Sequence, residues 1–396
     1  MLLNPELRGK PIAVCGSKEK RHGIVLAKSY PAKECGVKTG DTVNDAERKC
    51  PGLIIVPPHF EKYSEYSEKV FNIYTEYTDM VESYGLDECW LDVTGSRKLF
   101  GDGKTIADSI RERVKERTGL TVSVGVSFTK TLAKLGSDIK KPDATTVITQ
   151  KNLVSYTSRL LVEDMMMVGK AAARLLNKLN IRTIDDLARA NEEVLSYHLG
   201  INGTRLIAEA AGRGGDTVRH YTDSFAPESV GHSTTPPKDI GSYQAAEVVI
   251  YQLAEMVATR LRKHGLAASG IHLWLRYKNL ESLGRQRALT AATSSAHTIG
   301  AAGCKLMREC WTEQTPLRSL GITAIRLDRQ ETEQISFFED VEEKESRLSK
   351  SLDEIRGKYG FDSITRGTVI RDQVIVDNLS TGNKFLPFAK AREYEF

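Results

Sequence analysis

The order of periodic segments between residues 81 and 150 constrains the fold most strongly. YGLDECWLDV alternates like a strand, and residues 103–118 have the pattern of an amphipathic helix, with Ile106, Ile110 and Val114 at four-residue intervals. LTVSVGVSF is a second strand pattern, TKTLAKLGSDIKK is helical, and TTVIT predicts a third strand. This alternation is typical of a helix-covered sheet of the split βαβ kind.

The segments on either side predict further cores, and 396 residues are enough for two to three domains. The strand patterns PIAVC, GIVLA and LIIVP lie in residues 1–60, together with a short helix that ends at Gly36. Residues 151–222 are helical in pattern, and three prolines in residues 223–239 predict a linker.

The C-terminal part of the chain predicts a second small α/β layer and a tail. Residues 240–330 alternate helix, strand, strand, helix and strand, and a helix is expected at 341–358. Charge differs between the two parts: residues 231–330 hold 13 Lys and Arg against 7 Asp and Glu, whereas residues 331–396 hold 10 against 14. The basic part favours a polyanionic partner, although a solvated surface gives the same count.

The composition excludes several classes of protein. No apolar run approaches the roughly 18 to 20 residues that cross a bilayer, and MLLNPELRGK is no signal peptide. The six cysteines form neither a CxxC nor a zinc-like cluster with histidine. We therefore expect a cytoplasmic protein with reduced thiols and no membrane partner.

Two adjacent acids, Asp87 and Glu88, stand at the centre of the apolar strand pattern GLDECWLDVTG. Because neighbouring strand residues point to opposite faces, one of the two should be buried unless the strand ends or bends there. A buried carboxylate needs a cation, and hard oxygen ligands suit Mg²⁺. A metal site and an edge-strand acid pair both account for the pattern. For Asp92 we expect a hydrogen-bonded turn or cap.

Three side chains are placed where they could bind phosphate. Tyr30 and Lys33 are three residues apart and so share a helix face, and Lys141 ends a helix just before Pro142. A lysine at that place can attract phosphate, or it can simply complement the helix dipole.

The segment around Val168, Gly169 and Lys170 resembles a helix–hairpin–helix, in which backbone N–H groups at a helix N-terminus bind a DNA phosphate. The usual pattern has a glycine where this chain has Met167, and a plain helical bundle is the alternative. In the acidic tail, QISFFED carries Gln334, Phe337 and Phe338, which favours a docking peptide or a segment folded onto the core.

The order of these motifs resembles that of a Y-family DNA polymerase of the DNA polymerase IV type. The resemblance covers about residues 4–330 and rests on SYPAKECGVKTG, GLDECWLDVTG, SVGVSFTKTLAKLGSDIKKP, VGKAAARLLNKLNIRTIDDLA and SVGHSTTPPKD. It implies an α+β right-hand polymerase with a ferredoxin-like palm, small fingers, a helical thumb and an α/β little finger. The implied domains are fingers and the start of the palm at 1–60, palm at 61–150, thumb with helix–hairpin–helix at 151–222, linker at 223–239, little finger at 240–330, and a tail with a clamp-binding peptide at 331–396.

The resemblance also implies roles for single residues. Asp87 and Glu88 match the acidic pair of the family's SIDEAYLD strand, so it assigns them catalysis and the binding of two Mg²⁺ ions. The other implied roles are dNTP binding by Tyr30, Lys33 (arginine in the family) and Lys141, DNA binding by Val168, Gly169 and Lys170, and sliding-clamp binding by Gln334, Phe337 and Phe338. The implied function is low-fidelity translesion synthesis in DNA repair, by a monomer acting on primer–template DNA.

One family segment has no match here. Family members begin with a strand and turn of the type DMDAFFASVE, and this chain starts inside that region, at Met1. The first metal-binding aspartate and the aromatic gate that senses the sugar are thus unmatched, so we expect residues 1–396 to bind metal weakly and to polymerise poorly. A misassigned start codon, an incomplete fragment and an inactive paralogue each fit this departure.

Two other functions remain open. One is a non-catalytic paralogue that binds DNA and the sliding clamp. The other is a palm-type nucleotidyl cyclase, which uses the same metal chemistry. The helix–hairpin–helix pattern, the basic segment and the clamp-like peptide argue against a cyclase, because a cyclase does not need to hold DNA.

Overall fold

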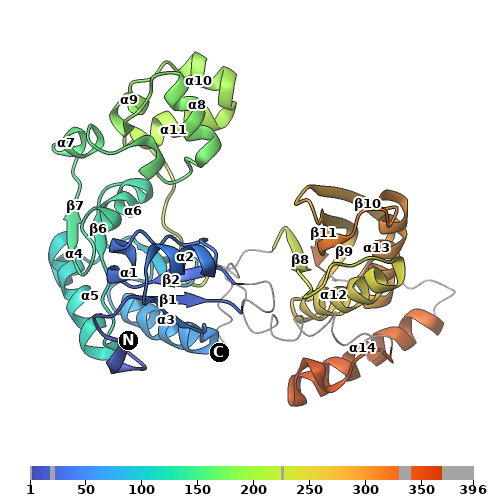
Figure 1. Cartoon of the computed structure of the whole chain (residues 1–396). Coiled ribbons are helices and arrows are strands. Elements are labelled where there is room, and N and C mark those ends of the chain that lie inside the picture. The colour runs from blue at the N-terminus through green and yellow to red at the C-terminus, as the bar shows by residue number, and fades with distance from the viewer. Residues whose placement is uncertain (1, 18–22, 224–226, 330–339, 368–396) are drawn as a thin grey trace. The chain divides into compact units, whose positions relative to one another are not determined.

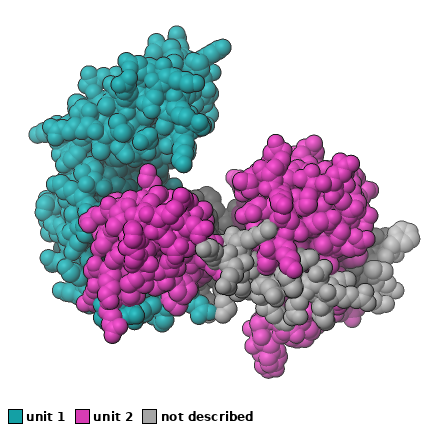
Figure 2. Space-filling view, viewed as in Figure 1, with its two compact units in different colours: residues 1–5, 61–225, 387–396 teal, residues 6–60, 226–386 magenta. Residues whose placement is uncertain are grey.

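The computed structural model describes residues 2–17, 23–223, 227–329 and 340–367, with only the backbone described for 340–346 and Asp362. These residues form two compact units, coloured separately in Figure 2. One unit holds residues 2–5 and 61–223, and the other holds 6–60 and 227–367. Within the described ranges, no helix is both long and apolar enough to span a bilayer.

Residues 60–147 form the α/β part of the first unit (Figure 1). Its elements in chain order are α3 (Phe60–Thr75), β4 (Val81–Tyr84), β5 (Glu88–Leu91), α4 (Arg97–Phe100), α5 (Gly103–Thr118), β6 (Val124–Val126), α6 (Lys130–Ile139) and β7 (Thr145–Val147). Strands β4 and β5 form an antiparallel hairpin, and β6 pairs with β7 in parallel. The predicted helix at 103–118 is confirmed, and its Ile106, Ile110 and Val114 are buried against α3 residues such as Phe71.

Helix α6 lies unusually close to β6 because two glycines face each other there. A Cβ on Gly125 would lie 1.9 Å from the carbonyl oxygen of Ala133, and a Cβ on Gly136 would lie 3.2 Å from the Cα of Gly125. Any side chain at Gly125 would therefore push α6 away from the sheet. This contact sets the position of the lysines that α6 carries.

Residues 151–211 form a helical subdomain, as predicted. Its elements are α7 (Leu153–Thr157), the 3₁₀ turn η2 (Val162–Asp164), α8 (Lys170–Lys178), α9 (Ile184–Ala188), α10 (Glu192–Leu199) and α11 (Ile201–Ala210). Leu176, Ile184, Leu187 and Leu195 are fully buried in its core. The first helix of the predicted helix–hairpin–helix is only the 3₁₀ turn η2.

Residues 6–60 contain a three-stranded sheet with the order β2-β1-β3. The elements are η1 (Pro5–Leu7), β1 (Ile12–Cys15), β2 (Val25–Lys28), α1 (Tyr30–Glu34), α2 (Val43–Lys49) and β3 (Ile54–Val56). The three predicted strands and the helix before Gly36 are confirmed. Apolar residues such as Val25, Ala32 and Ala46 form a small core.

Residues 229–329 form a four-stranded antiparallel sheet with the order β10-β9-β11-β8. Its elements are β8 (Ser229–Thr234), α12 (Tyr243–Lys263), β9 (Leu266–Tyr277), β10 (Ser282–Thr293), α13 (Ala296–Cys310) and β11 (Leu317–Arg329). Helices α12 and α13 pack side by side against the sheet (Figure 1).

Strand β8 differs from the prediction, which placed the whole of residues 223–239 in a linker. Pro227 and Pro236 lie on either side of the strand, so they leave its N–H groups free to pair with β11. The prolines delimit an edge strand rather than a structureless linker.

The chain continues in helix α14 (Asp340–Tyr359) and η3 (Phe361–Ser363), which confirms the helix predicted at 341–358. Arg356 donates to Glu255 of α12 over 2.9 Å, and Arg366 donates to the other oxygen of Glu255 over 2.8 Å. Asp353 accepts from Arg262 of α12 at 2.6 Å. Buried ion pairs thus hold α14 on α12.

Candidate active site

Asp87 and Glu88 lie at the tip of the β4–β5 hairpin. Tyr84 pairs with Glu88, Gly85 has φ +81°, and Ser67 of α3 donates a hydrogen bond to the carbonyl of Leu86. The prediction of one continuous strand was therefore wrong, because a turn at residues 85–87 interrupts the alternation. The turn leaves Asp87 exposed and the Glu88 side chain 37% exposed, so neither acid is buried.

A chain of ion pairs connects Glu88 with Lys141 through α6. Lys134 Nζ lies 3.3 Å from Glu88 Oε1 and also pairs with Asp138, and Asp138 Oδ1 lies 2.5 Å from Lys141 Nζ. Lys134 and Asp138 are one helical turn apart, so their side chains share a face of α6. The structure thus brings together two of the predicted site residues, and two α6 side chains mediate the contact.

Lys134 and Asp138, the two α6 members of this chain of ion pairs, stay charged near neutral pH. Burial lowers the pKa of Lys134, but the hydrogen bond to Asp138 and the charge of Glu88 outweigh burial and raise it overall. Burial raises the pKa of Asp138, but hydrogen bonds from Lys134 and Lys141 outweigh burial and lower it overall. Carboxylate and ammonium groups therefore alternate along the cluster.

Glu82 of β4 anchors the other side of the hairpin. Its side chain is 10% exposed and accepts from Lys130 Nζ at 2.5 Å and from Arg219 Nη2 at 2.8 Å. Burial raises the pKa of Glu82, but the bonds from Arg219 and Lys130 outweigh burial and lower it to about 2. Trp90 of β5 donates to the carbonyl of Lys130 at 3.0 Å, so both strands of the hairpin are tied to α6.

Tyr30 and Lys33 lie on α1, in the other compact unit. Ser29 caps the helix by accepting from the N–H of Ala32, and it also accepts from the N–H of Ile12 in β1. Tyr30 is 46% exposed, and Lys33 Nζ lies 6.0 Å from the centroid of its ring. The two side chains share one face of α1, as their spacing predicts.

Comparisons with known proteins match nearly the whole chain. The profile of the impB/mucB/samB family matches residues 1–138, and that of its C-terminal domain matches residues 227–337. DNA polymerase IV of Acetivibrio thermocellus is 42% identical over 94% of this chain and 94% of the relative. The chain belongs to the DNA polymerase IV family.

Other relatives of the DNA polymerase IV family agree. DNA polymerase IV of Moorella thermoacetica is 36% identical over 90% of this chain and 89% of the relative. A solved chimera of Y-family DNA polymerases superposes with a TM-score of 0.72 at 24% identity, over 82% of this chain and 94% of that chain. The predicted family and the predicted α+β polymerase fold are confirmed.

The turn before α8 contains a left-handed residue at the position where the helix–hairpin–helix pattern usually has glycine. Met167 has φ +74°, in the region that glycine adopts at the lowest cost. Gly169 precedes α8 without a side-chain cap, whereas Val168 is buried in the helical core. The N–H groups of Gly169 and Lys170 at the start of α8 can donate to a ligand, whereas the N–H of Val168 already donates to the carbonyl of Met165.

Sequence reasoning missed Asp138, Glu82 and Arg219. The roles of Glu82 and Arg219 depend on partners far away in sequence. Asp138 stands one helical turn after Lys134 and could have been recognised from that spacing. The expected turn role of Asp92 is confirmed, because its carboxylate accepts from the N–H of Thr94 at 2.9 Å. Gln334, Phe337 and Phe338 lie outside the described residues.

Proposed function

We propose that this chain extends a primer on a DNA template by nucleotidyl transfer and copies damaged templates with low fidelity. Family membership supports this class of reaction. The observation that carries the proposal is the ion-pair chain from Glu88 through Lys134 and Asp138 to Lys141. It places a candidate metal-binding carboxylate and a candidate triphosphate-binding lysine in one cluster.

Asp87 and Glu88 fit a magnesium ion by their donor chemistry. Mg²⁺ is usually held by one or two carboxylates together with water and substrate phosphates, rather than by an all-protein cage. The described ranges contain no group of three or more His, Cys, Asp or Glu side chains suited to a metal, so a two-carboxylate site is the kind that they can provide. Two bound Mg²⁺ ions would activate the primer 3′-OH and stabilise the leaving pyrophosphate.

The cationic side chains would hold the triphosphate. Lys141 is exposed and paired with an equally accessible Asp138, so it can exchange this partner for a phosphate oxygen at little cost. Lys134 has two carboxylates in reach, so it stays paired with Asp138 when Glu88 turns to a metal. We assign Tyr30 and Lys33 to dNTP binding on the basis of the sequence motif alone. The ammonium charges of Lys33, Lys134 and Lys141 would offset the negative charge that develops during phosphoryl transfer.

DNA would be held through its backbone. The N–H groups before α8 and basic side chains of the four-stranded sheet, such as Arg276 of β9, would provide contacts to phosphate. Such binding releases counterions and is therefore steeply salt-dependent.

We predict that affinity for a primer–template duplex falls by roughly 10³-fold between 50 and 200 mM salt, because about six phosphates are neutralised. Fluorescence anisotropy with a labelled duplex measures the dependence. Lys170→Gln should reduce the slope by about one, whereas Lys178→Gln, at the other end of α8, should leave it unchanged. A flat salt dependence would favour a cyclase-like function and contradict DNA synthesis.

We further propose a sliding clamp as partner through Gln334, Phe337 and Phe338, on the basis of the sequence motif alone. Replacing both phenylalanines by alanine should abolish capture on an immobilised bacterial clamp, because aromatic anchors carry most of the energy of such peptides. Primer–template binding by the same variant should equal that of the wild type. Equal clamp capture by the variant and the wild type would remove the proposal.

A further inference from the structure

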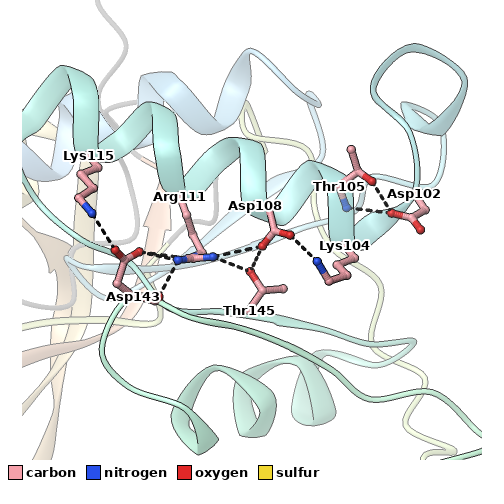
Figure 3. Close-up of polar contacts among 8 residues, drawn as sticks. All are labelled: Asp102, Lys104, Thr105, Asp108, Arg111, Lys115, Asp143 and Thr145. Carbon is pink, nitrogen blue, oxygen red and sulfur yellow. Dashed lines mark hydrogen bonds and ion pairs between the residues drawn. The ribbon is translucent and has the colours of Figure 1, made fainter.

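One face of α5 carries a row of charged side chains, three cationic and one acidic, that contacts the segment between α6 and β7. Lys104, Asp108, Arg111 and Lys115 follow each other at intervals of four, three and four residues, which places them on one helix face. Figure 3 shows the row facing Asp143 and Thr145, at the start of β7. None of these side chains belongs to the acid hairpin or to the lysine cluster of α6.

Arg111 is the centre of the row because it holds both the side chain and the backbone of Asp143. Its Nε and Nη2 donate to Asp143 Oδ1 at 3.1 and 2.8 Å, and Nη2 also donates to the Asp143 carbonyl at 2.5 Å. The guanidinium side chain is only 21% exposed. This two-nitrogen grip depends on the planar fork of arginine, which lysine lacks.

The grip fixes a backbone conformation that few residues adopt unaided. Asp143 has φ +51°, in the left-handed region, which costs a non-glycine residue roughly 1 kcal/mol. Lys115 Nζ lies 3.2 Å from the second carboxylate oxygen. Arg111 and then Lys115 hold the pKa of Asp143 below its usual range, so the carboxylate stays ionised and paired near neutral pH.

Asp143 is two residues from Lys141, and the five residues between α6 and β7 are held at both ends. At the α6 end, Asp138 pairs with Lys141, and at the β7 end, Arg111 holds Asp143. When Lys141 leaves Asp138 for a phosphate, the contacts of Asp143 with Arg111 and, more weakly, with exposed Lys115 remain on this segment. The Arg111 contact therefore sets the point from which Lys141 extends.

We propose that Arg111 is a positioning residue for Lys141: by holding Asp143, it places the lysine for the incoming triphosphate. The inference rests on the proposed function and deepens it. Arg111 contacts neither nucleotide nor DNA in this role, and its effect passes entirely through Lys141. Loss of a hydrogen bond to a charged group lowers an equilibrium constant by roughly 10- to 100-fold, so the effect is measurable.

The test measures the affinity of dCTP for the full chain bound to a primer–template. The template presents a guanine opposite the incoming nucleotide, and the primer is chain-terminated, so binding is measured without catalysis. Arg111→Gln should weaken dCTP binding by roughly 10- to 100-fold, with primer–template affinity unchanged. Arg111→Lys should recover only part of the loss. Lys104→Gln, which removes an exposed ion pair on the same helix face, should stay within about two-fold of the wild type.

A double variant decides whether the effect passes through Lys141. In a Lys141→Ala background, Arg111→Gln should have no further effect on dCTP affinity, whereas a purely structural role would add its loss in both backgrounds. If Arg111→Gln fails to fold, Asp143→Ala removes the side-chain part of the same grip, leaving the bond to the backbone carbonyl, and should give the same non-additivity. Additive losses, or wild-type affinity in Arg111→Gln, would overturn the inference while leaving the proposed function intact. A wild-type complex that binds no dCTP would overturn both.

Discussion

Replacing Glu88 by alanine is expected to lower Mg²⁺-dependent dNTP binding, and any primer extension by the wild type, by at least about 100-fold. The reason is that Glu88 is one of the two carboxylates at the tip of the β4–β5 hairpin, and its partner Lys134 already has Asp138. The fold should therefore tolerate the loss while the metal site does not. Titration of dNTP with Mg²⁺ into the primer–template complex measures the effect, and thermal melting checks folding.

Two further variants test whether the negative charge of Glu88 itself is needed, or whether the loss of any acidic side chain nearby has the same effect. Glu88→Gln keeps an oxygen for Lys134 but loses the charge that a metal needs, so it should fail like the alanine variant. Glu65→Gln removes an exposed acid of α3 that pairs with Lys62 and Lys69, and it should behave as wild type. If Glu88→Ala leaves nucleotide binding and extension unchanged, the chain is a non-catalytic DNA- and clamp-binding paralogue.

The largest expected effect on stability comes from Glu255→Ala, at about 3–5 kcal/mol. Glu255 is 7% exposed and accepts from Arg356, which is 5% exposed, and from Arg366, which is 34% exposed. Removing the carboxylate leaves two guanidinium groups without their partner, one of them buried. We expect α14 to detach from α12 and hydrogen exchange in both helices to accelerate.

The relative losses of stability in three variants test this explanation. Arg366→Ala should cost far less than Glu255→Ala, because Arg366 is partly solvated and Arg356 still pairs with Glu255. Glu247→Ala, on the same helix α12, removes an exposed pair with Arg308 and should cost less than about 1 kcal/mol. Hydrogen exchange together with urea unfolding, followed by tryptophan fluorescence, measures the series. Equal losses for Glu255→Ala and Glu247→Ala would contradict a buried docking pair.

Local pattern was a good guide where a segment's own periodicity decides its structure. Helix α5 spans the predicted residues because three apolar side chains at four-residue intervals face a core. This holds whichever residues form the rest of that core. The local pattern gave the wrong structure at the β4–β5 hairpin, because the alternation of YGLDECWLDV continues through the turn that contains Asp87. Only the pairing of Tyr84 with Glu88 and the bond from Ser67 reveal that the chain reverses there.

The sequence by itself determined the family, most of the helices and strands, and the identity of the acids and lysines proposed to act on nucleotide. The tertiary structure decided which charges meet: Glu88 with Lys134, Arg111 with Asp143, and Arg356 with Glu255. The last two pairs join residues 32 and 101 positions apart. Periodicity describes which face of a helix or strand is buried, but ion pairing depends on distance and solvent exposure, which arise only when separate segments pack together.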